Sequence, residues 1–153
     1  MKKLAGSVVQ IILSIAIPII FFLINSFVVE PNLSVNAIPL DETLAAEDFA
    51  VAFSDVFLKA VLVCIILNVL FVIAMVFLNM NSTAVWFIFL VLNMLVSCVF
   101  VYLFRVDYLT DTDTFVTTTL MFTLLNFVTY FISSIFTCSD YKHFNPVARF
   151  IRR

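Results

Sequence analysis

The chain has 153 residues, of which 64% are hydrophobic and only 12% are charged, with a formal net charge of −2. Soluble domains are about 45–50% apolar and about 25% charged, and a soluble fold of this size cannot bury so large an apolar share. The composition therefore excludes a water-soluble domain and predicts an all-α membrane protein whose surroundings are the lipid bilayer, with no nucleic acid as a partner.

Four apolar segments are each long enough to cross a bilayer, which takes about 20 helical residues. The predicted spans are residues 4–29, 56–79, 84–104 and 114–137, each to within a few residues. Pro18 lies inside the first span, where its ring removes a backbone hydrogen bond, so we expect a kink near Ser14. A cleavable signal peptide is the competing interpretation of this span, but no small-x-small cleavage pattern follows it.

The basic residues are sorted by side of the membrane. Six of the eight lie next to the two termini: Lys2, Lys3, Lys142, Arg149, Arg152 and Arg153. Because basic flanks stay on the cytoplasmic side, both termini are expected in the cytoplasm. The predicted architecture is a single domain, residues 1–153, folded as an antiparallel bundle of four transmembrane helices in the bacterial inner membrane.

The first outer loop, residues 30–50, is the largest segment expected outside the lipid. Pro31 and Pro39 predict an extended first half. Acidic residues from about residue 41 favour a helix start, since carboxylates stabilise helix amino termini, so we expect the second helix to begin there and to continue into the membrane. The acids of this loop form a candidate interaction surface: Asp41, Glu42, Glu47 and Asp48.

The second outer loop, RVDYLTDTD, contains three more aspartates. Thr112 or Asp113 is the expected N-cap of the fourth helix. A calcium site is the alternative interpretation, but the turn glycine and the distal glutamate of a calcium loop are missing. We expect a solvated acidic surface here, and on the outer part of the second helix an ion pair between Asp55 and Lys59, which are four residues apart.

Asn68, Asn93 and Asn126 lie near the middle of the second, third and fourth spans. Each amide needs a hydrogen-bond partner in an environment without water, so we expect all three to face protein. In one interpretation they join helices by hydrogen bonds. In the other they line a path for an ion or small solute. Nearby hydroxyl residues are compatible with both.

Enzyme chemistry has little support in this chain. There is a single histidine, His143, and the cysteines Cys64, Cys98 and Cys138 form no C-x-x-C motif. A single glycine also leaves no room for a glycine-rich phosphate loop. We expect no enzymatic activity, no metal site and no cofactor.

The basic tail, residues 138–153, is expected on the cytoplasmic side. Arg149, Arg152 and Arg153 are candidate contacts for acidic lipid headgroups, each cation contributing about 1 kcal/mol near an anionic surface. The simplest role of the tail is to set orientation; docking of a cytoplasmic partner is the alternative.

Two classes of function follow. In the first, the protein is a non-catalytic component that binds another membrane protein or itself, as an accessory subunit or a toxin-immunity-like protein. In the second, it forms an oligomeric channel or small-solute transporter that uses the asparagines of the membrane midplane.

Overall fold

The computed structural model describes residues 2–40, 44–76, 78, 82–108 and 110–135. Within these ranges the regular secondary structure is helical, apart from one isolated bridge between Pro39 and Thr110, and short connections join the helices. The elements are α1 (Lys2–Ile24), a π-helical turn η1 (Asn25–Val29), α2 (Glu30–Asn36), α3 (Ala46–Val76), α4 (Thr83–Asp107) and α5 (Thr112–Ile135). Four helical segments are long and apolar enough to cross a membrane: Ser7–Asn36, Ala46–Val76, Thr83–Asp107 and Thr112–Ile135.

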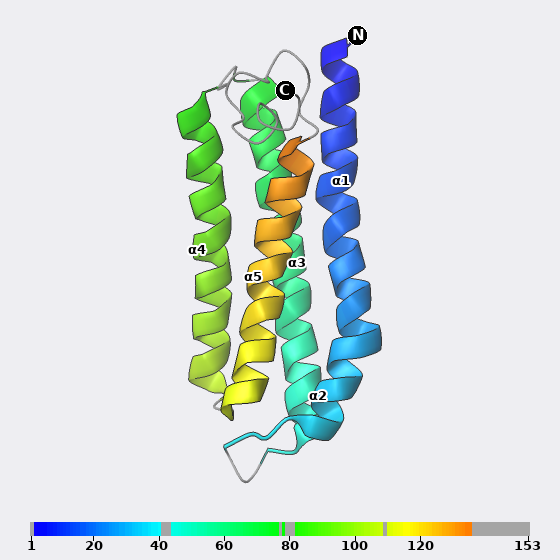
Figure 1. Ribbon diagram of the computed structural model, residues 1–153, viewed down its shortest axis with the longest axis vertical. Helices are drawn as coiled ribbons and strands as arrows, with labels where there is room; N and C mark the ends of the chain where they lie inside the picture. The colour runs from blue at the N-terminus through cyan, green and yellow to red at the C-terminus, as the bar shows by residue number, and fades with distance from the viewer. Residues whose placement is uncertain (1, 41–43, 77, 79–81, 109, 136–153) are drawn as a thin grey trace.

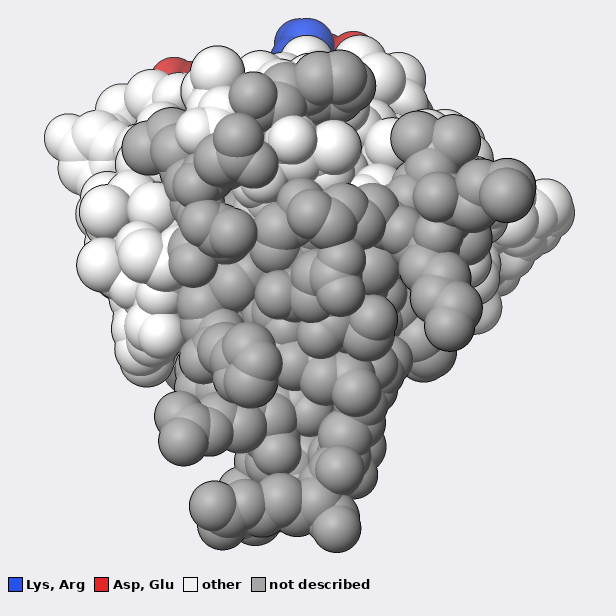
Figure 2. Space-filling model, turned by 90° about the horizontal axis from the view of Figure 1, so that it is seen from above, with Lys and Arg blue, Asp and Glu red and all other residues white. Residues whose placement is uncertain are grey.

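The helices lie side by side, with α3 and α5 between α1 and α4 (Figure 1). We call the end where α2, the start of α3 and the α4–α5 connection meet the α2 end, and the opposite end the amino-terminal end. The described surface seen from the amino-terminal end is almost entirely uncharged, with the few visible charges at one edge (Figure 2). Large apolar side chains are exposed along every long helix, as a lipid environment requires.

The prediction of an extended segment after Pro31 is wrong for residues 30–36. The chain passes from α1 through the π-helical turn directly into α2, and Pro31 lies in the first turn of α2. Proline is tolerated there because the amide that it lacks has no partner in a first helical turn. The first helical rod is therefore longer than the predicted span 4–29.

Two predicted helix starts also differ from the structure. The helix that contains the second span begins at Ala46 rather than near residue 41, and residues 41–43 lie outside the described ranges. At α5 the cap is Asp111, whose carboxylate accepts from the backbone amides of Asp113 and Thr114 at 3.2 and 3.3 Å. The helix thus starts with Thr112, one residue after the observed cap.

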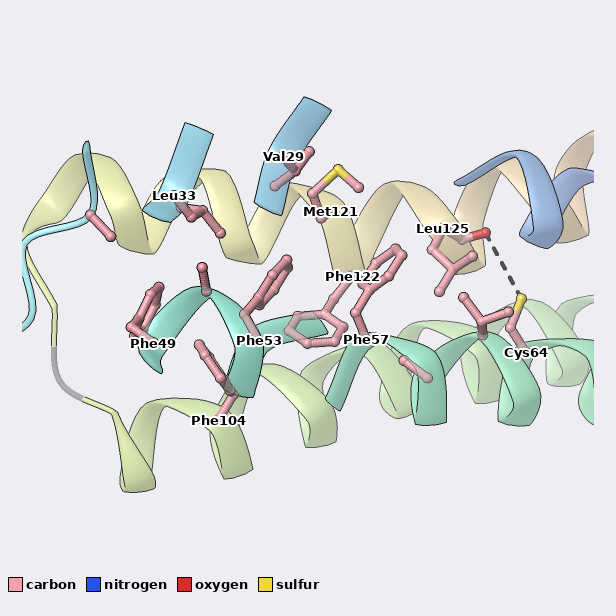
Figure 3. Close-up of a cluster of buried hydrophobic side chains, with 14 residues drawn as sticks. Val29, Leu33, Phe49, Phe53, Phe57, Cys64, Phe104, Met121, Phe122 and Leu125 are labelled. Carbon is pink, nitrogen blue, oxygen red and sulfur yellow. Dashed lines mark hydrogen bonds between the residues drawn. The ribbon is translucent and has the colours of Figure 1, made fainter. Parts of the chain in front are cut away.

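The main hydrophobic core fills the α2 end and is built largely from phenylalanine (Figure 3). Phe122 of α5 is fully buried, and its ring centroid lies 5.5 Å from that of Phe53, 5.8 Å from that of Phe57 and 5.9 Å from that of Phe100. Rings at such separations attract one another beyond the area that they bury. Since lipid tails are as apolar as the core, this close packing, rather than exclusion of water, holds α3, α4 and α5 together here.

A second, smaller cluster lies toward the amino-terminal end. Tyr130 packs between Phe71, at 5.1 Å between ring centroids, and Trp86, at 5.6 Å. The Tyr130 hydroxyl donates a hydrogen bond of 2.6 Å to the backbone carbonyl of Trp86. The polar end of this fully buried side chain is thereby satisfied, and α5 is joined to the first turns of α4.

Candidate functional site

The three asparagines of the predicted midplane lie between the two aromatic clusters along the helices. Asn68, Asn93 and Asn126 are all buried, with at most 1% of each exposed. Trp86 and Ser97, which share a helical face with Asn93, are buried as well. The polar face of each helix is therefore turned into the bundle.

Asn68 and Asn93 meet across the interface between α3 and α4. The Asn68 Nδ2 donates to Asn93 Oδ1 at 3.3 Å and to the carbonyl of Cys64, one turn earlier in α3, at 2.8 Å. Asn93 Nδ2 in turn donates to the carbonyl of Phe89 at 2.8 Å. Each amide is thus held by its own helix and oriented toward the other.

Asn126 does not join this pair. Its Nδ2 donates to the carbonyl of Phe122 within α5 at 3.2 Å, and its buried Oδ1 has no hydrogen-bond partner. At the level of the asparagines, α4 and α5 are joined instead by Ser97, whose hydroxyl lies 3.0 Å from the carbonyl of Phe122 and 3.2 Å from that of Asn93. The structure brings together two of the three predicted asparagines.

Sequence reasoning missed a polar contribution from α1. Gln10 and Ser14 are buried on this helix, which packs against α3 and α5, and both Gln10 Nε2 and Ser14 Oγ lack a partner. The Oδ1 atom of Asn68 is also buried and unpaired. Gln10 is the only glutamine in an otherwise largely apolar first span, and this feature of the sequence would have been enough to predict its burial.

Sequence reasoning also missed a polar chain at the α2 end. Asn25 Nδ2, in the π-helical turn, donates to Ser54 Oγ at 2.9 Å, and Ser54 Oγ donates to Glu30 Oε2 at 2.7 Å. The chain links η1 and α2 to α3. Only the residue types were visible in the sequence, because Asn25 and Ser54 are brought together by the packing of α1 on α3.

The connection after α2 is fixed to the start of α5. Asp111 N donates to the carbonyl of Ile38 at 3.1 Å, beside the bridge between Pro39 and Thr110. The side-chain hydroxyl of Thr114 and nearby backbone amides hold the pKa of the Asp111 carboxyl below its usual value, so this cap is anionic at neutral pH. The connection after α2 and the connection between α4 and α5 therefore form one surface.

The remaining candidate residues divide by position. Glu47 and Asp48 are exposed in the first turn of α3, whereas Asp41 and Glu42 lie outside the described residues. Asp55 and Lys59 form the expected exposed ion pair, with 2.6 Å between carboxylate and ammonium. The candidate headgroup contacts of the tail also lie outside the described ranges: Arg149, Arg152 and Arg153.

Neither cysteine in the described ranges forms a disulfide. Cys64 is buried, with its Sγ 3.9 Å from the carbonyl of Leu125, and Cys98 is exposed on α4. Among the described residues, no group of three or more histidine, cysteine, aspartate or glutamate side chains is placed to hold a metal ion. No protein-family model matches the chain, and neither does any curated protein sequence or solved structure.

Proposed function

We propose that the protein is a non-catalytic component of a membrane complex that binds another membrane protein, as an accessory subunit or a toxin-immunity-like protein. In this proposal the four spans cross the bacterial inner membrane as an antiparallel bundle with both termini in the cytoplasm. The α2 end then faces outward. The distribution of basic residues supports this orientation, because six of the eight lie next to the termini.

The observation that carries the proposal is the surface at the α2 end. Val35, Ile38 and Leu40 are 78%, 59% and 62% exposed, respectively, on a segment that is joined to the residue before α5 by the backbone hydrogen bond from Asp111 to Ile38. The acids Glu47 and Asp48 are exposed nearby in sequence, at the start of α3. Ordered apolar side chains beside charges, outside the expected lipid core, are typical of a protein interface.

Site-specific photo-crosslinking in native membranes tests this proposal. A crosslinking side chain at Ile38 is expected to capture one protein in a defined product. Ile12 is a matched control, because it is also isoleucine and is 57% exposed, but lies on α1 within the expected lipid region. No product at Ile38, or the same products at both positions, would contradict binding through the α2 end.

A second candidate, an oligomeric channel or small-solute transporter, has one specific observation in its favour. Gln10, Ser14, Asn68 and Asn126 each hold a buried polar atom without a partner. Such atoms are costly in a dry interior, so a passing solute or ordered water is one way to satisfy them.

Flux into liposomes distinguishes this candidate from the first. Asn126→Leu removes an amide that bonds only within its own helix, so a solute path through this region would lose flux while the fold survives. Protein that conducts no ion or small polar solute before substitution would contradict the second candidate and leave the first in place.

A further inference from the structure

A groove runs between α4 and α5 on the outside of the bundle, near the α2 end. Its volume is about 270 Å³, and its wall is largely apolar with a few polar groups. Four of its lining residues come from α4 and three from α5: Cys98, Val101, Tyr102, Arg105, Phe115, Thr119 and Thr123. Thr119 Oγ1 is buried in this region without a hydrogen-bond partner.

Arg105 lines the part of the groove that is nearest to the α2 end. Its guanidinium carbon lies 4.3 Å from the centre of the Phe115 ring, an arrangement in which the ring face attracts the cation. Among the residues that the structure describes, no carboxylate forms a salt bridge with it. The same two side chains also line a second hollow of about 120 Å³, with Leu40, Thr110 and Thr112. The two hollows thus meet at Arg105.

The depth of Arg105 follows from its neighbours. The charge-free part of α3, residues 60–76, is about 26 Å long at about 1.5 Å per residue, close to the roughly 30 Å of a bilayer core. Phe104, next to Arg105, packs its ring on Phe53, with 5.5 Å between centroids, and Phe53 precedes that charge-free part. Arg105 therefore lies at the level of lipid headgroups, and the groove runs from it toward the middle of the bilayer, parallel to the acyl chains.

We propose that this groove binds a phospholipid with a zwitterionic headgroup, phosphatidylethanolamine, with its phosphate on Arg105 and one acyl chain between α4 and α5. Guanidinium groups bind phosphate oxygens through charge-assisted hydrogen bonds. The distance along α4 from Arg105 to Cys98 is about 10 Å, which is long enough to hold the part of an acyl chain nearest to the headgroup.

The carboxylates close to Arg105 along the chain favour a zwitterionic headgroup. Asp107 and Asp113 are exposed on either side of the connection that holds Thr110 and Thr112, and Asp111 lies between these threonines. A purely anionic lipid would be repelled by these carboxylates, whereas an ammonium group beside the phosphate is attracted by them. The inference does not depend on the protein partner proposed above, because the groove for the acyl chain is lined by α4 and α5 and shares no residue with Val35, Ile38 and Leu40; Leu40 lines only the neighbouring hollow.

Native mass spectrometry of the purified full-length protein tests the proposal. The probes are phosphatidylethanolamine, phosphatidylglycerol and diacylglycerol with identical acyl chains. One phosphatidylethanolamine is expected to bind in preference to both other lipids. Arg105→Gln should weaken its binding about tenfold, as expected for losing hydrogen bonds to a charged group.

Two further variants complete the test. Lys59→Gln removes another exposed cation at the α2 end, one that is paired with Asp55 and does not line the groove, so it should leave lipid binding unchanged. Thr123→Phe should block the groove while Arg105 remains, and its melting temperature reports whether the fold survives. Equal losses for Arg105→Gln and Lys59→Gln, or binding of phosphatidylglycerol or diacylglycerol as tight as that of phosphatidylethanolamine, would overturn the proposal.

Discussion

Replacing Asn68 and Asn93 with leucine, singly and together, tests whether their amides hold α3 against α4. The bond between them is 3.3 Å long, whereas each amide also makes a 2.8 Å bond to its own helix. For each asparagine, the hydrogen bond between the helices is therefore weaker than the hydrogen bond to its own helix. Its contribution is best isolated by a double-mutant cycle, because each single substitution also changes packing and removes bonds within a helix.

The expected size of the effect follows from the membrane setting. Interhelical side-chain hydrogen bonds in membranes average about 0.6 kcal/mol and reach about 1.7 kcal/mol. Both side chains are almost fully buried, so water does not compete, but the bond of 3.3 Å is slightly longer than the usual range. We expect a coupling energy of about 0.6 to 1 kcal/mol between the two substitutions.

The assay is reversible unfolding in mixed micelles of mild detergent and dodecyl sulfate, followed by the fluorescence of Trp86. Asn68→Leu combined with Asn126→Leu is the matched control, because Asn126 bonds only to the Phe122 carbonyl of its own helix. This control pair should be additive to within about 0.3 kcal/mol. A coupling energy equal in the two pairs, or below about 0.2 kcal/mol for Asn68 with Asn93, would refute the reasoning.

Three further predictions follow from the core, the helix cap and the distribution of charge. Phe122→Ala empties the centre of the aromatic cluster and should lower the free energy of unfolding by about 3–5 kcal/mol, whereas Phe127→Ala, at a position 39% exposed, should change it little. Melting temperatures in detergent compare the two variants, and equal losses of stability would contradict the packing argument. The Thr114 hydroxyl, with nearby backbone amides, lowers the pKa of the Asp111 carboxyl. The stabilisation that the Asp111 cap gives α5 is therefore fully present above a pH of about 4 and is lost as the pH falls through the folded pKa. Hydrogen-exchange protection of the first turn of α5 should fall in that acid range, and Asp111→Asn should retain the cap without this pH dependence; a pH profile unchanged by the substitution would count against it. In a chain without native cysteines, a cysteine at Lys3 should react only from the cytoplasm and one at Asp111 only from outside; the reverse pattern would invalidate the proposed orientation.

The long helices could be predicted because their signal is local and additive. A run of about 20 apolar residues specifies a membrane-spanning helix whatever lies around it. The segment after Pro31 was mispredicted because a proline has two opposite local meanings, an extended neighbour before it or a first helical turn containing it. The packing of α2 on α3, through the contact of Glu30 with Ser54, favours the helical alternative, and no local rule contains that contact.

The candidate site was predictable only in part, for a related reason. Helical periodicity places Asn93 and Ser97 on one face, and an amide against lipid is costly, so burial could be expected from the sequence. Which amides meet depends on the rotation and height of each helix relative to its neighbours. The sequence therefore indicated three buried asparagines without showing which of them meet, and the structure pairs Asn68 with Asn93 and leaves Asn126 to its own helix.

The π-helical turn between α1 and α2 determines which face of α2 points into the bundle relative to the buried face of α1. Buried positions recur every four residues on both sides of it, at Gln10 and Ser14 before the turn and at Val29 and Leu33 after it. A regular α-helix repeats every 3.6 residues, so a spacing of four drifts around the helix by about 40° each time. The wider turn, closed by bonds five residues apart, absorbs part of this drift. Deleting one residue inside it would let the turn close as a regular α-helix with bonds four residues apart, so α2 would keep nearly the same orientation and Leu33 would stay buried. Deleting one residue in the regular helix on either side would instead rotate α2 by about 100° and expose Leu33, so the π-helical turn is the one place in this rod that tolerates the change.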